Sequence, residues 1–164
     1  MARMKKKEVD FLQQMLGQMD SPFYLSYRFI ALSELVTREN DALYKNEVGL
    51  GIKELRVLRL VHLNPGQPVF MIGRWSFAEK AMTSKLVGKL CELGLLERRI
   101  DGKDARSLLL YVTPAGAEKV KAADAAAHRL FAQHFPSMSP ERAAQLMGTL
   151  DELILEFVSS ATQA

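Results

Sequence analysis

The stretch that decides the fold is Leu95–Thr113, which reads LLERRIDGKDARSLLLYVT and begins directly after Gly94. Two short apolar runs, Leu95–Ile100 and Leu108–Val112, flank a charged turn that contains Asp101-Gly102. An Asp-Gly pair between apolar runs is a strong local signal for a β-hairpin. We therefore predict a two-stranded hairpin that follows a helix, with Gly94 just past the last helical turn.

The predicted hairpin is basic, since it carries Arg98, Arg99, Lys103 and Arg106 on or beside its strands. A basic hairpin attached to the end of a helix is the element that a winged helix-turn-helix protein presents to DNA. Because Arg98 and Arg99 are consecutive in a strand, their side chains alternate. We expect only one of the two to face a nucleic acid.

The distribution of charge supports a nucleic-acid partner more than the net charge does. The 164 residues carry a formal net charge of only +3, but eight basic and five acidic residues lie between Gln67 and Thr113. From Pro114 onward there are four basic and six acidic residues. The positive charge is therefore concentrated around the hairpin, as expected for a protein that binds DNA.

Other compositional signals favour a cytoplasmic protein that is not an enzyme. Cys91 is the only cysteine, so no intrachain disulfide can form, and buried packing is its simplest role. No apolar run approaches the length of a membrane span. His62, His128 and His134 lack metal-ligand spacing, and no nucleophile or phosphate-loop pattern is present. We expect no catalytic residue, metal or cofactor.

The rest of the chain is predicted to be helical, so that the fold class is mainly α with a small β-hairpin wing. Apolar residues recur at three- and four-residue spacing, and Ser, Thr, Pro and Gly mark the helix ends. The predicted helices cover Val9–Met19, Pro22–Lys45, Ile52–Val61, Phe70–Trp75, Lys80–Leu93, Pro114–Phe135 and a last segment that begins at Pro140.

The helix over Lys80–Leu93 precedes the wing and is the predicted DNA-reading helix. Its expected inward positions are Met82, Leu86, Leu90 and Leu93. Its expected DNA-facing positions are Ala81, Ser84, Lys85 and Lys89. Lysine donates to guanine O6 or N7, and a serine hydroxyl suits bases or phosphates. The simpler alternative is that these side chains form an ordinary solvated surface, and for Lys89 a phosphate contact or plain exposure is expected.

The long helices at the two ends of the chain predict a homodimer. Their apolar faces are too large for a small winged-helix core to cover, and isolated helices gain too little from propensity to stand unpacked. We divide the chain into an N-terminal dimerisation region (1–48), a winged helix-turn-helix region (49–113) and C-terminal dimerisation helices (114–164) of one compact fold. A two-fold dimer would present two reading helices to a palindromic site.

Three segments resemble the multiple antibiotic resistance regulator (MarR) family of bacterial transcription factors. LVGKLCELGLLERR over 86–99 is similar to the family's reading helix and first wing strand. Asp104-Ala105-Arg106-Ser107 is similar to its Asp-x-Arg wing signature, and Leu-Tyr-Val-Thr-Pro-Ala-Gly follows at the usual distance over 110–116. With long helices at both ends, the resemblance covers nearly the whole chain.

The resemblance implies roles for the wing residues. In the family, the aspartate that matches Asp104 orients the arginine that matches Arg106, and that arginine enters the minor groove. A narrow A·T-rich minor groove has an enhanced negative potential, which attracts arginine. Arg98, Arg99 and Lys103 would contact phosphates, which adds affinity rather than sequence preference.

The resemblance also implies a repressor of a neighbouring operon and of itself, released by a small aromatic carboxylate or phenolic effector. Such a ligand suits an apolar pocket that holds one cation and a few polar groups. The candidate effector-binding residues are Tyr24, Arg28, His62, Met71 and Trp75. Each of them also has an ordinary role in a core or a hinge.

The chain departs from the family pattern in two respects, both in the turn before the reading helix. The turn before the reading helix usually carries glycine or another small residue, where this chain has Ser76-Phe77-Ala78-Glu79. Glu79 is also a weaker N-cap than serine or aspartate. Because fold alone does not fix function, a winged-helix protein-interaction module without sequence-specific DNA binding is the alternative.

Overall fold

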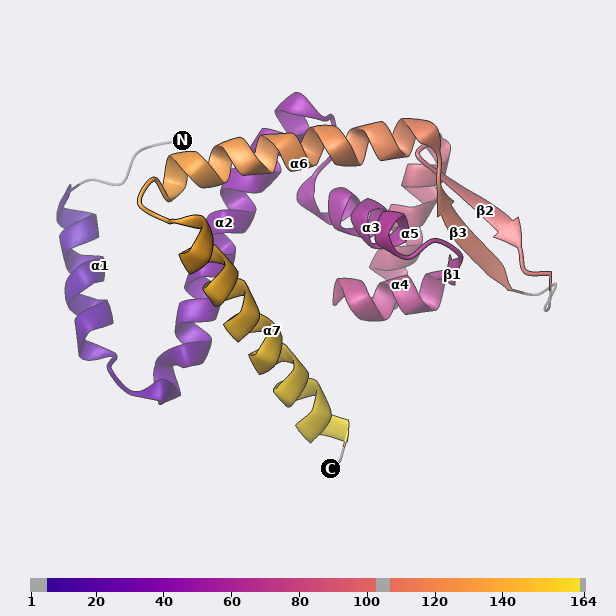
Figure 1. Ribbon diagram of the computed structural model, residues 1–164. Helices are drawn as coiled ribbons and strands as arrows, with labels where there is room; N and C mark the ends of the chain where they lie inside the picture. The colour runs from indigo at the N-terminus through magenta and orange to yellow at the C-terminus, as the bar shows by residue number, and fades with distance from the viewer. Residues whose placement is uncertain (1–5, 103–106, 163–164) are drawn as a thin grey trace.

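The computed structural model describes residues 6–102 and 107–162 and is mainly helical, as predicted (Figure 1). The helices are α1 (Lys6–Gln18), the 3₁₀ helix η1 (Pro22–Tyr24), α2 (Leu25–Glu47), α3 (Ile52–Leu63), α4 (Val69–Ser76), α5 (Lys80–Glu92), α6 (Pro114–His134) and α7 (Pro140–Thr162). The strands are β1 (Gln67–Pro68), β2 (Leu96–Ile100) and β3 (Leu108–Val112). Every predicted helix is present, with ends shifted by a few residues.

The predicted hairpin is confirmed, and a third strand is added to it. β2 and β3 pair antiparallel from Leu96↔Val112 to Ile100↔Leu108, and the backbone N–H of Asp101 donates to the carbonyl oxygen of Ser107 over 2.9 Å. β1 pairs with the other edge of β3, which gives the order β1-β3-β2. The sequence does not reveal β1, because two residues carry no periodicity.

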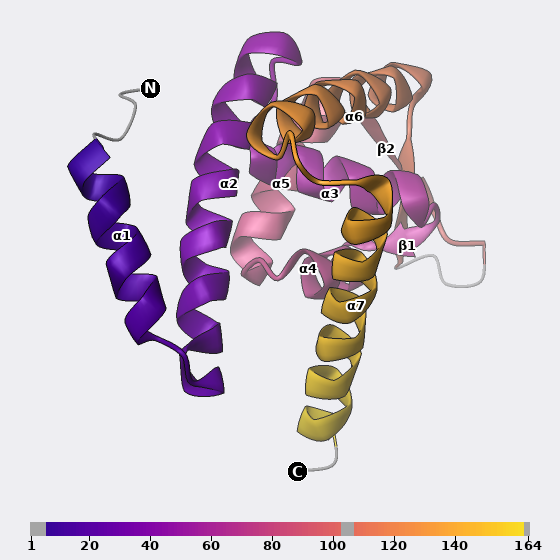
Figure 2. The same cartoon turned by 60° about the vertical axis from the view of Figure 1, so that its left-hand side comes forward.

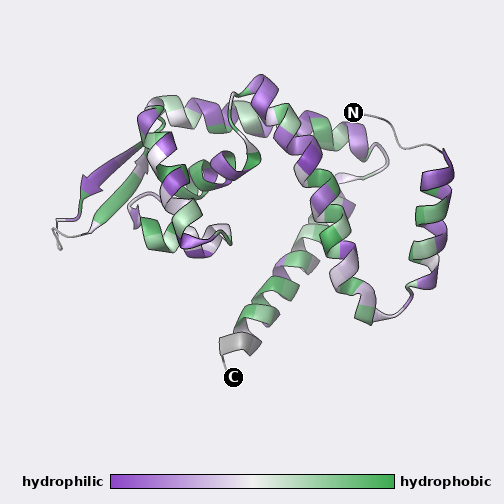
Figure 3. Cartoon of the chain, turned by 180° about the vertical axis from the view of Figure 1, so that it is seen from behind, coloured by the Kyte–Doolittle hydropathy of each residue, from purple (hydrophilic) through white to green (hydrophobic). Residues whose placement is uncertain are grey.

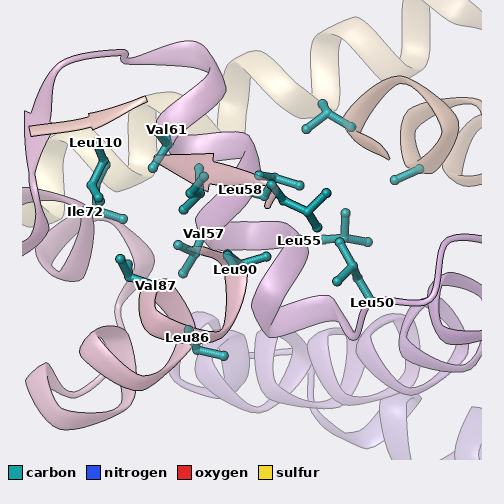
Figure 4. Packing of buried hydrophobic residues seen from close by; sticks show 14 of the residues in the cluster. Leu50, Leu55, Val57, Leu58, Val61, Ile72, Leu86, Val87, Leu90 and Leu110 are labelled. Carbon is teal, nitrogen blue, oxygen red and sulfur yellow. The ribbon is translucent and has the colours of Figure 1, made fainter. Parts of the chain in front are cut away.

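The core of the winged region is built around α3, as Figure 4 shows. Apolar side chains of α3, α4, α5 and β3 meet there and are fully or almost fully buried. They are Leu55, Val57, Leu58, Val61, Ile72, Leu86, Val87, Leu90 and Leu110. This packing holds α5 against the base of the wing.

The predicted inward face of α5 is wrong at two positions. Met82 and Leu93 are 40% and 52% exposed, whereas Thr83 and Val87 are buried. The hydroxyl of Thr83 donates to the carbonyl oxygen of Glu79 over 3.1 Å, so this polar side chain can be buried without an unmet hydrogen bond. Gly73 of α4 lies against Thr83, so the absence of a side chain at residue 73 leaves room for Thr83 between the two helices.

The turn from α5 into β2 has the backbone geometry predicted for Gly94. Its φ of 68° lies in the left-handed region, which glycine adopts without strain. The N–H of Gly94 donates to the carbonyl of Cys91, and the N–H of Leu95 donates to the carbonyl of Leu90, both over 2.9 Å. This pair of bonds is a Schellman motif, which ends α5 and directs the chain into β2.

The start of α6 is hydrogen-bonded to the same turn between α5 and β2. The hydroxyl of Thr113 donates to the carbonyl of Gly94 over 2.7 Å and accepts from the N–H of Gly116 over 3.1 Å. The N–H of Thr113 donates to the carbonyl of Leu95 over 3.1 Å. Gly116 is buried against that carbonyl, with no room for a side chain. The Thr-Pro-Ala-Gly sequence therefore fixes α6 to the base of the wing.

Polar contacts join the long helices to the winged region. Arg59 of α3 donates to Asp124 of α6 over 2.8 Å and lies over the ring of Tyr44 of α2, 5.2 Å from its centroid. Burial lowers the pKa of Arg59, but hydrogen bonds with Tyr44 and Asp124 outweigh burial and raise the pKa overall. Lys119 of α6 donates to the carbonyl of Val48 over 2.7 Å. Movement of α2 or α6 is therefore coupled to α3.

Replacement of Asp41 by alanine should lower the free energy of unfolding by about 1 kcal/mol, the usual loss for an N-cap. Gly51 precedes α3 without a capping side chain, and the carboxylate of Asp41 accepts from the N–H of Ile52 over 2.9 Å instead. Hydrogen bonds from Lys45 and Ile52 hold the pKa of Asp41 below its ordinary value of 3.8. The contribution should therefore be complete above that value and disappear as the pH falls through the lower pKa of the folded state.

Chemical denaturation of the Asp41→Ala variant between pH 7 and pH 3 measures this difference. Asp41→Asn is the matched control, because an asparagine oxygen still accepts from the N–H of Ile52. It should lose less stability than Asp41→Ala. Equal losses in the two variants at pH 7 would contradict the capping role.

Candidate nucleic-acid interface

The outer face of α5 is a surface of small and basic side chains. The predicted DNA-facing residues Ala81, Ser84, Lys85 and Lys89 are all exposed. They lie opposite the face that packs on α3 and α4, because Thr83, Leu86, Val87 and Leu90 occupy the buried positions. Glu79 at the N-cap makes no side-chain capping hydrogen bond, in agreement with its weak capping preference. α4 and α5 thus form a helix-turn-helix whose second helix is open to a ligand.

Lys89 differs from Lys85 in one respect. The ammonium of Lys89 makes a 2.7 Å ion pair with the carboxylate of Glu54 on α3. Burial raises the pKa of Glu54, but the hydrogen bond from Lys89 and other favourable contacts lower the pKa overall. Part of the positive charge of Lys89 is therefore neutralised within the protein. The sequence could not indicate this ion pair, because Lys89 and Glu54 are 35 residues apart.

The two arginines of β2 lie on opposite faces of the wing. Arg99 pairs with Glu97, and its guanidinium lies 4.3 Å from the centroid of the Tyr111 ring. Arg98 is opposite Leu110, which is buried in the core, and Arg98 is close enough to Cys91 of α5 to affect the pKa of the thiol. Arg98 is therefore on the side of the wing that α5 occupies.

The remaining wing candidates, Lys103, Asp104 and Arg106, lie outside the described residues. The structure fixes the two ends of the segment that carries them, through the hydrogen bond between Asp101 and Ser107. In Figure 1 the hairpin projects from the winged region, away from the long helices. Roles for these three residues depend on the resemblance.

The candidate effector residues do not meet in a single chain. Arg28, near the start of α2, donates to the carbonyls of Leu16 and Met19 and so holds the turn between α1 and α2. Tyr24 belongs to the same end of the molecule. Met71 and Trp75 lie on α4, and both views of the molecule separate α4 from that end (Figure 2). A pocket built from all of these residues would need a second chain.

His62 lines a separate hollow of about 340 Å³ between α3, β3 and the start of α6. Its other walls include Val61, Pro65, Tyr111 and Ala117. The hollow is at the lower end of the size range of ligand sites, and it contains none of the other four candidates. The effector-binding residues therefore stay a prediction.

A groove of about 1230 Å³ lies between α2, α6 and the beginning of α7. Its walls are mainly apolar, with Leu32, Val36 and Phe131 among them. Glu39 also lines it, and one carboxylate oxygen of Glu39 is buried without a hydrogen-bond partner among the described residues. The sequence predicted unpaired apolar faces on these helices but not a groove with a buried acceptor.

Three further findings concern metal binding, thiol reactivity and membrane spans in the part of the chain that the structure describes. No group of three or more His, Cys, Asp and Glu side chains is arranged to hold a metal ion within residues 6–102 and 107–162. Burial raises the pKa of the Cys91 thiol, which disfavours the reactive thiolate. Among the described helices, each is either too short or too polar to span a membrane.

A helix-turn-helix followed directly by a β-hairpin, and flanked by long helices from both ends of the chain, defines the winged-helix class. Several solved structures with a similar fold are MarR-family regulators. A MarR-family transcription regulator has a TM-score of 0.73 at 20% identity, over 92% of this chain and 99% of the other. A Mycobacterium tuberculosis MarR-family protein, solved in complex with salicylic acid, has a TM-score of 0.66 at 22% identity, over 82% and 97%.

A probable transcriptional regulator from Pseudomonas aeruginosa is 26% identical, with a TM-score of 0.63 over 79% of this chain and 98% of the other. No family model and no curated protein matches the sequence. The chain therefore has the fold of the MarR-family regulators, and the resemblance predicted from the wing is confirmed at the level of the fold.

Proposed function

We propose that the protein is a homodimeric, sequence-specific DNA-binding transcriptional regulator. The observation that carries the proposal is the open face of α5, with Ala81, Ser84 and Lys85 exposed next to a wing that projects from the same winged region. A reading helix of this kind enters the major groove. Arg106 would anchor the wing in the minor groove, and Arg98 is better placed than Arg99 for a phosphate contact.

Exposed apolar side chains on the long helices near the two ends of the chain support the proposed dimer. α7 stands apart from α2 in Figure 2, and Figure 3 shows hydrophobic residues along it. Its exposed side chains include Ile154, Leu155, Phe157 and Val158. A second copy would cover these residues and fill the groove between α2, α6 and α7. A donor from that copy would also satisfy Glu39, whose buried oxygen is otherwise unmet.

The regulatory mechanism proposed is steric repression of a neighbouring operon and of the protein's own gene. A dimer bound to a palindrome would block a promoter, and an effector would release it by favouring a geometry with misplaced reading helices. A small aromatic acid or phenol is the proposed effector class, because a protein of the same fold was solved with salicylic acid. The single cysteine agrees with a cytoplasmic site of action.

Replacement of Lys85 by alanine should weaken DNA binding and reduce the slope of log affinity against log salt by about one for each half-site, and so by about two for the dimer. The same change at Lys89 should have a smaller effect on the slope, because Glu54 already pairs with that ammonium. Anisotropy titrations at several salt concentrations compare the two variants, which differ by one helical turn. A larger loss of slope in Lys89→Ala would contradict this assignment.

The wing assignment is tested by Arg106→Ala. We expect operator binding to weaken by roughly 1–3 kcal/mol per half-site, the effect of losing one specifying contact. The loss should be greatest for operators with an A·T-rich segment where the wing binds, because the narrow groove attracts the guanidinium. Unchanged operator affinity would remove Arg106 from the interface.

A further inference from the structure

Phe77 occupies a position that is unfavourable for a large apolar residue. It lies in the turn between α4 and α5 with φ 53° and ψ 28°, in the left-handed region. Among the described residues it is the only non-glycine with a positive φ. This backbone conformation is strained for residues other than glycine. The ring is also 85% exposed, so burial does not compensate for the strain.

The turn at Phe77 is flanked by three basic side chains and by the exposed acidic side chain of Glu79. Arg74 and Lys80, three residues before and after it, are both exposed. Arg56 of α3 reaches the turn from the other side, and its guanidinium donates to the carbonyl of Ser76 over 3.4 Å. An exposed ring between cations suits a groove lined by phosphates better than an apolar protein surface.

The turn is also at the end of α5 that reads DNA. The N-terminal residues of a reading helix are the ones that reach the base edges in the major groove. Phe77 precedes the first residue of α5 by three positions, and Ala81 follows in the first turn of the helix. Apolar side chains in the major groove have one natural target, which is the 5-methyl group of thymine.

We propose that Phe77 contacts the 5-methyl group of a thymine in each half-site and so determines base preference there. The inference deepens the proposed DNA-binding function and rests on it. Strain at an exposed residue is consistent with a site kept for binding rather than for folding. Ala81, with its small exposed side chain, would leave room for the base beside the ring.

The test replaces each thymine of a selected operator by deoxyuridine, which removes only the methyl group. For the full-length wild-type dimer, one position in each half-site should weaken binding by roughly fourfold, the effect of one buried methyl group. The Phe77→Gly variant should be insensitive at that position and unchanged elsewhere. Phe70→Ala is the control, because Phe70 is another exposed ring but lies at the opposite end of α4.

Phe77→Gly should also unfold at a temperature no lower than wild type, because glycine relieves the left-handed backbone. Phe77→Ala, which keeps the strain, should show the same loss of deoxyuridine sensitivity. Identical deoxyuridine profiles for wild type and Phe77→Gly would overturn the proposal while leaving site-specific binding intact. A change of oligomeric state in Phe77→Gly would overturn it in favour of a protein contact. Absence of any site-specific binding by wild type would instead defeat the underlying function.

Discussion

Replacement of Gly116 by alanine is expected to lower the free energy of unfolding by about 3 kcal/mol, at the upper end of overpacking effects. A Cβ atom at this position would lie 2.2 Å from the carbonyl oxygen of Leu95 and 2.9 Å from the side chain of Val112. The first contact is with backbone, which cannot rotate away. Relief would require α6 to separate from the turn between α5 and β2, and the hydrogen bonds of Thr113 would then be lost.

Denaturant unfolding followed by circular dichroism measures this loss. Gly88→Ala is the control, because a Cβ there meets no atom within 4 Å. Gly88 lies inside α5, so alanine should raise stability by up to about 1 kcal/mol through helix propensity. A Gly116→Ala protein as stable as wild type would show that the close contact between α6 and the wing base is not required.

Replacement of Phe157 by glutamate is expected to convert the dimer to monomers and to weaken operator binding by about 100-fold or more. Phe157 is 81% exposed in the single chain, on a helix that has no buried residue over 140–160, the part whose exposure the structure describes. Burial of one phenylalanine contributes roughly 1.5–3 kcal/mol, and two-fold symmetry applies the loss twice. A monomer has one reading helix for a palindrome with two half-sites, so DNA affinity should fall as well.

Light scattering coupled to size-exclusion chromatography measures the oligomeric state across a range of concentrations. Gln145→Glu adds the same charge to a polar position of α7 and should leave the dimer intact. A Phe157→Glu protein that still dimerises and binds the operator as wild type does would contradict the assignment of α7 to the interface.

Sequence reasoning predicted the elements that depend on local signals. The paired strands of the hairpin, the left-handed glycine at 94 and the Thr-Pro start of α6 each depend on signals within a few residues, and the structure contains all three. The three- and four-residue spacing of apolar residues predicted the long helices, because this spacing is also a local signal. The fold class could therefore be predicted from the sequence, and the wing signature connected that fold to a family.

Features that depend on contacts between distant segments were not predictable. Thr83 of α5 is buried beside Gly73 of α4, whereas Met82, which was predicted to face inward, is exposed. The pairing of Lys89 with Glu54 and the buried oxygen of Glu39 also depend on tertiary structure. The sequence showed that the turn at Phe77 departs from the family pattern, but only the backbone angle shows that it is strained.

Fluorescence anisotropy most directly tests the central claim, that the protein is a site-specific DNA-binding regulator. The wild-type protein is titrated, at several salt concentrations, into its best duplex selected from a random pool and into a scrambled duplex of the same composition. A site-specific regulator should prefer the selected duplex by roughly 10³-fold or more, with affinity falling steeply as salt increases. Equal and weak binding to both duplexes would contradict the claim and would favour a winged-helix module that binds protein.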